Sequence, residues 1–151
     1  MSAKEHTTRF VWAADPSMAW GLVTLRESAD KAVVAFAQPH VHGSQEAAMA
    51  ADAERLGVTL YKIERSSEIA DVRTPAPAAG CFAFVFSTDE PHMVWSKVDP
   101  EAPAQARSIH WMFPDAAEAV QRAALATQEP RSDGHVFRAY LLTWSVEAVE
   151  V

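Results

Sequence analysis

The sequence contains few of the features that mark a specialised class of protein. It has one cysteine in 151 residues, so no disulfide can form within the chain, and a reducing compartment is favoured. No apolar run approaches the roughly 20 residues that span a bilayer. The first residues lack the apolar core of a secretory signal peptide. We therefore expect a cytoplasmic protein with no membrane-spanning segment.

Positive charge is also scarce. The chain carries 13 lysines and arginines against 20 aspartates and glutamates, which gives a formal net charge of −7. Proteins that bind nucleic acids or anionic membranes use clustered basic residues to neutralise phosphates, and the basic residues here are scattered singly. We expect an acidic protein that binds neither nucleic acid nor membrane and whose partner would be basic.

The chain has no nucleotide-binding loop, no set of zinc ligands and no nucleophile motif, so no cofactor can be named. It does have the composition of a folded protein. Hydrophobic residues make up 49% of the chain and include five tryptophans and seven phenylalanines, which is enough to build a core. The length fits one domain over residues 1–151.

Hydrophobic periodicity and turn residues predict a mixture of strands and helices. Ser44 is placed to cap a helix over 44–56, with Met49, Ala53 and Leu56 forming its inward stripe and Gly57 ending it. Pro114 and Asp115 open a second helix that runs to about Thr127. Apolar or alternating segments predict strands over 8–14, 33–37, 58–64, 81–86, 93–98, 109–113 and 135–151.

The segment 16–30 has two interpretations. Asp15 followed by Pro16 is a typical helix opening. Gly21, Val23 and Thr24 are poor helix formers, and residues 21–26 could instead form a strand that turns back into 33–37. We prefer the hairpin slightly.

These elements predict an α+β fold. The expected sheet is mostly antiparallel with two helices on one face, a ferredoxin-like arrangement with extra strands. If 16–30 were a helix, an α/β fold with a partly parallel sheet would be the alternative.

The turn between 39 and 44 carries the chain's only closely spaced pair of histidines, His40 and His42. Two imidazoles that converge could bind a metal ion or act in acid–base catalysis, with His92 as a further contributor. Gly43 and Ser44 could instead form an anion pocket at the start of the helix. The simplest interpretation is that the turn only opens the helix.

The tryptophans fall on predicted strands or at their ends. If two helices cannot cover them all, the uncovered sheet face would bind a ligand or a second subunit. We therefore expect a non-catalytic domain, a homodimer, that holds a small apolar ligand or a partner protein through an aromatic sheet face. The alternative is a small enzyme built around His40 and His42. The residues assigned to the aromatic site are Trp20, Trp95, Trp111 and His110.

Overall fold

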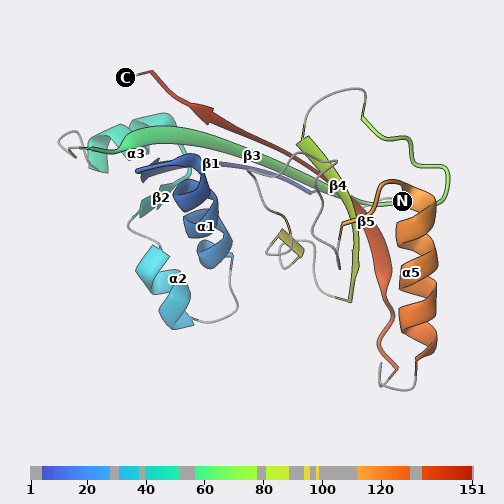
Figure 1. Cartoon of the computed structure of the whole chain (residues 1–151). Helices are drawn as coiled ribbons and strands as arrows, with labels where there is room; N and C mark the ends of the chain where they lie inside the picture. The colour runs from blue at the N-terminus through green and yellow to red at the C-terminus, as the bar shows by residue number, and fades with distance from the viewer. Residues whose placement is uncertain are drawn as a thin grey trace. The chain divides into compact units, whose positions relative to one another are not determined.

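The computed structural model describes residues 5–27, 31–37, 40–51, 57–77, 81–88, 94–95, 98, 112–129 and 134–150. Among these residues no helix has the length and apolar composition needed to cross a lipid bilayer. Figure 1 shows the helices and strands, which follow the chain in the order β1 (Glu5–Ala13), α1 (Pro16–Arg26), α2 (Lys31–Ala37), β2 (Val41–His42), α3 (Gln45–Ala51), β3 (Thr59–Ile69), β4 (Cys81–Ser87), α5 (Ala116–Gln128) and β5 (Arg138–Ala148).

The described strands form a five-stranded sheet in the order β2-β1-β3-β5-β4. β1 pairs antiparallel with β2, and β4 pairs antiparallel with β5. The α+β class and the antiparallel sheet expected from the sequence are confirmed. The ferredoxin-like arrangement is not confirmed.

Contacts within the chain group its residues into two compact units. Unit 1 consists of Met1–His6 and Ser66–Trp144, and unit 2 consists of Thr7–Arg65 and Ser145–Val151. Strands β1, β3 and β5 contribute residues to both units. That the chain forms one domain stays a prediction from the sequence.

In unit 2, helices α1 and α3 contact opposite faces of the strands. Trp12 on β1 donates a hydrogen bond from Nε1 to the carbonyl oxygen of Ala48 on α3, at 2.8 Å. Trp12, Ala48 and Leu60 form a buried cluster. Arg65 on β3 lies five positions beyond Leu60 and contacts α1 instead. Successive residues of a strand point to opposite faces, so two positions separated by an odd number of residues, such as Leu60 and Arg65, face different helices.

In unit 1, the paired strands β4 and β5 are covered on both faces. Phe84 lies opposite Leu141 in the register, and both belong to the buried cluster under α5. Cys81 lies opposite Trp144, whose ring meets Trp95 edge to face at a centroid distance of 6.3 Å. The strand predicted over 81–86 is confirmed as β4, and burial of the consecutive residues 83–85 shows that both of its faces are covered.

The predicted hairpin of residues 21–26 and 33–37 is wrong. Residues 21–26 belong to helix α1 and residues 33–37 belong to helix α2, so the hairpin is replaced by two helices in contact. The Asp15 carboxylate caps α1 by accepting a hydrogen bond from the backbone N–H of Met18 at 2.7 Å. Capping and burial of Trp20 and Val23 outweigh the low helix propensity of the segment.

The helix predicted over 44–56 is observed as α3, but its inward residue differs. Ala48 is fully buried, whereas Met49 is 41% exposed, so the expected stripe through Met49 is wrong. The alanine lets the Trp12 indole approach the helix backbone closely, which explains the register. Ala53 and Leu56 lie outside the described residues. Gly57 has the positive φ of 77° expected of the residue that ends a helix.

Of the other predicted strands and helices, some are observed, one has a different backbone conformation and one lies partly outside the described residues. The expected strands over 8–14, 58–64, 81–86 and 135–151 correspond to β1, β3, β4 and β5, and the second helix corresponds to α5. Val94 and Trp95, expected in a strand, have helical backbone and are buried. Phe113 makes an isolated antiparallel bridge with Phe84, and residues 109–111 lie outside the described part of the chain.

Candidate functional site

The histidine turn lies at the edge of the sheet in unit 2. His42 belongs to the two-residue strand β2 and is opposite Phe10 of β1. Both His40 and His42 are half-buried. The Ser44 hydroxyl accepts a hydrogen bond from the backbone N–H of Ala47 at 3.1 Å, so Ser44 is the cap of α3 as predicted. Gly43 is exposed beside it.

No metal site is found around this turn among the residues that the structure describes. None of their histidine, cysteine, aspartate and glutamate side chains gather in groups of three or more that could hold an ion. His92, His110 and Trp111 lie outside the described residues, so their predicted contributions stay predictions. The pairing of His42 with Phe10 and the cap at Ser44 place the turn between a strand end and a helix opening.

The four described tryptophans are buried in the two units. Their exposed fractions are 8% for Trp12, 5% for Trp20, 4% for Trp95 and 6% for Trp144. Trp20 packs under the guanidinium of Arg65, and Trp95 packs against Trp144. Within the described chain these rings fill the interior of each unit and do not form an open aromatic surface.

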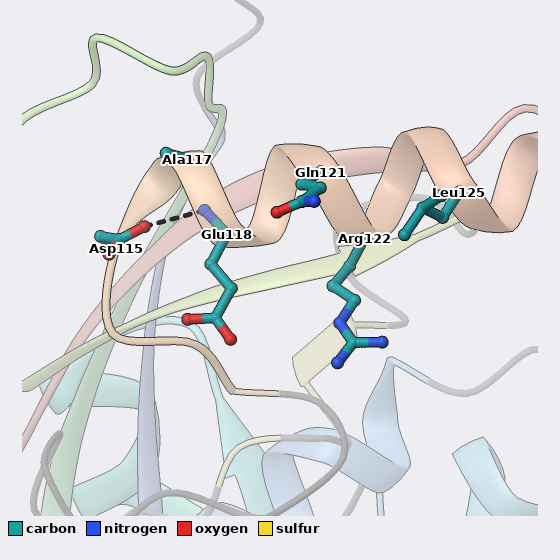
Figure 2. A pocket seen from close by; sticks show the side chains of 6 residues that line it. All are labelled: Asp115, Ala117, Glu118, Gln121, Arg122 and Leu125. Atoms are coloured by element: carbon teal, nitrogen blue, oxygen red, sulfur yellow. Dashed lines mark hydrogen bonds between the residues drawn. The ribbon is translucent and has the colours of Figure 1, made fainter.

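One surface depression of unit 1 lies along α5. The depression has a volume of about 610 Å³ and is lined by residues of this helix and of its cap. Figure 2 shows the side chains that line it. The side chains of Glu118 and Arg122 project to the same side of α5, four positions apart. The Asp115 carboxylate accepts a hydrogen bond from the backbone N–H of Glu118 at 2.8 Å and so begins the helix. The lining residues are Asp115, Ala117, Glu118, Gln121, Arg122 and Leu125.

A second depression of about 440 Å³ adjoins the first one. It shares Arg122 and Leu125 with it and extends to the C-terminal end of α5, where Phe86 of β4 also lines it. Leu125 is 50% exposed between the two depressions. The inward side of α5 is formed by Ala116, Ala119 and Ala123, and Ala124 is exposed.

A group of charged side chains forms the second candidate site, in unit 2. Arg65 is 2% exposed, and its guanidinium carbon lies 4.1 Å from the centre of the Trp20 ring. It donates hydrogen bonds to Thr24 Oγ1 at 2.7 Å and to the Trp20 carbonyl oxygen at 3.4 Å. Burial lowers the pKa of Arg65 to about 9, with Glu27 opposing the shift and Arg9 adding to it. Arg65 therefore remains charged at neutral pH.

The sequence contained a signal for this buried arginine. Tyr61, Ile63 and Arg65 alternate along β3, and the first two are buried. Strand periodicity places the third on the same face, so Arg65 was predictable as an inward cation. Its partners were not predictable, because residues 16–26 were assigned to a hairpin. Cys81 is exposed at the start of β4.

Comparison with known proteins gives no further guidance. No protein family, no curated protein and no solved structure matches this chain.

Proposed function

We propose that this protein is a non-catalytic binding domain that holds a segment of a partner protein along the exposed side of α5. The observation that supports this proposal is the pair of adjoining depressions that share Arg122 and Leu125. Together they give α5 a strip in which an exposed leucine lies between charged groups. Apolar contacts bordered by polar side chains are typical of protein interfaces.

The chemistry of the strip suggests what the partner offers. An apolar side chain of the partner would cover Leu125 and the edge of Phe86. Glu118 would face a basic group, and Arg122 would face an acidic one. The net charge of −7 favours a basic partner overall. The sequence suggested an aromatic sheet face for this role, but the described tryptophans are buried and α5 offers the better surface.

A second copy of the chain is one occupant with matching chemistry. Glu118 and Arg122 have opposite charges on the same side of one helix. Two α5 helices crossing antiparallel through a two-fold axis would bring Glu118 of each copy within reach of Arg122 of the other. The homodimer expected from the sequence is thus a specific form of the proposal.

The test compares two substitutions at equally exposed apolar residues. Leu125→Glu changes the strip, and Met18→Glu changes a 49% exposed residue of α1 in unit 2. Peptides selected for binding to the wild-type protein from a random library should lose affinity for Leu125→Glu and retain it for Met18→Glu. If the occupant is a second copy of the chain, light scattering should show a dimer for the wild type and for Met18→Glu and a monomer for Leu125→Glu. The proposal is contradicted if Leu125→Glu and Met18→Glu change the peptide affinity equally and also change the self-association equally.

The alternative of a small enzyme at the histidine turn has less support. Ser44 is engaged as a helix cap, and no described carboxylate or cysteine joins His40 and His42 in a ligand group. We therefore do not extend the proposal to catalysis.

A further inference from the structure

The C-terminal end of α5 is negatively charged. The last turn of this helix, all of whose residues are described, contains no basic residue, and Glu129 follows it as the C-cap. The last carbonyl groups of a helix lack partners within the helix and give its end a partial negative charge of about half a unit, which lysine or arginine usually offsets. Here the exposed carboxylate of Glu129 adds to that charge. The end of α5 therefore attracts a cation from outside the helix.

The second depression of α5, with a volume of about 440 Å³, lies at this end of the helix. Phe86, Leu125 and Ala126 give it an apolar side, and Gln128 and Glu129 give it a polar one. A side chain with a long alkyl stem and a cationic head matches this order. Its stem can cover the apolar side while its head reaches the Glu129 carboxylate and the end of the helix.

The walls of this depression are held in place by contacts within unit 1. The Phe86 ring packs against the rings of Phe113 and Phe137, at centroid distances of 5.7 and 5.8 Å. Thr127 Oγ1 accepts a hydrogen bond from the backbone N–H of Phe137 at 2.9 Å, which ties the end of α5 to the segment that leads into β5. Figure 1 shows these two parts of the chain side by side. A site that is already formed lowers the cost of ordering side chains when a ligand binds.

The lining also includes the cation Arg122, which would repel a second cation. Arg122 lies seven residues before Glu129, which corresponds to about 10 Å along a helix. Charges in solvent are screened over about 8 Å at physiological ionic strength. A cation bound at Glu129 is therefore attracted by the nearby carboxylate more strongly than it is repelled by Arg122.

We propose that the C-terminal depression of α5 binds an arginine side chain of the partner segment. Its guanidinium pairs with the Glu129 carboxylate, and its alkyl stem lies on Leu125 and Phe86. Arginine is favoured over lysine, because the planar guanidinium can lie on an aromatic ring and can donate two parallel hydrogen bonds to a carboxylate. This inference rests on the proposed function, since it names the group that the partner inserts.

The first test uses n-butylguanidinium chloride as the probe, with sodium chloride at the same ionic strength as the reference. The backbone amide resonances of residues 126–129 should shift and saturate with the probe and not with sodium chloride. Glu129→Gln should weaken binding of the probe roughly two- to fivefold. Glu118→Gln makes the same chemical change near the other end of α5 and should leave the affinity unchanged. Both glutamates lie on the outer side of α5, and circular dichroism checks that each variant is folded.

The second test uses peptides that are selected on the wild type and lose affinity for Leu125→Glu. Replacing the inserted arginine with citrulline, which is uncharged and of similar shape, should weaken binding to the wild type roughly two- to fivefold. The same replacement should have little effect on binding to Glu129→Gln.

The inference is overturned if n-butylguanidinium binds Glu129→Gln as tightly as it binds the wild type. It is also overturned if the selected peptides contain no arginine, or if no citrulline replacement distinguishes the wild type from Glu129→Gln. In these cases peptides that depend on Leu125 still support the proposed function. If no selected peptide depends on Leu125, the proposed function fails, and the n-butylguanidinium titration still decides whether the depression binds a guanidinium group.

Discussion

Replacing Arg65 with lysine tests whether the planar guanidinium holds α1 against the strands of unit 2. Arg65 stacks on Trp20 and donates to Thr24 Oγ1 and to the Trp20 carbonyl oxygen at the same time. Lysine keeps the positive charge but cannot stack a flat group while donating sideways. The Arg65→Lys variant should therefore lose the stacking on Trp20 and part of the hydrogen bonding. Because the positive charge is kept, the substitution leaves no anion without its cation.

The expected loss follows from the contacts. A buried hydrogen bond from a charged donor contributes about 1.5–3 kcal/mol, and a desolvated cation–π contact adds about 0.5–2 kcal/mol. Because lysine retains part of each, we expect the free energy of unfolding to fall by about 2–3 kcal/mol. Urea denaturation followed by circular dichroism measures this change, provided that the slope with denaturant stays constant.

A double-mutant cycle separates the Thr24 contact from general disruption. Thr24→Val removes the hydroxyl acceptor, and its combination with Arg65→Lys should show a coupling of about 1 kcal/mol. Lys62→Arg, a substitution at a half-exposed position of the same strand, serves as the control and should change stability by less than about 0.5 kcal/mol. If Arg65→Lys costs no more than this control, Arg65 does not hold α1 and the reasoning is refuted.

Two further substitutions test the packing and capping of α3. Leu60→Ala removes a fully buried side chain from the cluster with Trp12 and Ala48 and should lower the free energy of unfolding by about 2–5 kcal/mol. Leu125→Ala, at a half-exposed position, should lower it much less. Equal losses in the two variants would contradict the assigned core. Ser44→Ala removes the helix cap and should cost about 1 kcal/mol in thermal or urea unfolding, and a neutral result would mean that the bond to the Ala47 N–H does not stabilise α3.

The sequence predicted those elements whose local signals agree with their surroundings. Helix α5 begins at Asp115 as expected, because a capping aspartate follows Pro114 and helix-forming alanines follow the cap. Strand β4 was recognised because its apolar side chains suit burial on both faces. In these segments local propensity and tertiary burial favour the same structure.

The segments that were misassigned have local signals that disagree with their packing. Residues 33–37 contain adjacent valines and read as a strand, yet they form part of α2, which packs on α1. The residues that face a partner also depend on what that partner is: Ala48 faces inward because Trp12 approaches the backbone of α3 there. The arginine site was missed for the same reason, since Arg65 and Glu27 are brought together only when α1 is a helix.

The helical conformation of residues 16–26 can be tested by replacing a glycine in α1 and a glycine outside it with alanine. We expect the two substitutions to change the stability of the protein in opposite directions. Gly21 lies inside α1 with open space where a Cβ would be, so Gly21→Ala should stabilise the protein by about 0.5–1 kcal/mol through the higher helix propensity of alanine. Gly57 also has open space but a φ of 77°, so Gly57→Ala should destabilise it by about 1–2 kcal/mol. Urea denaturation of both variants measures the difference. Because the same methyl group is added without a clash at both sites, only the backbone conformation can give the two changes opposite signs. A loss of stability in Gly21→Ala would return this segment to the hairpin.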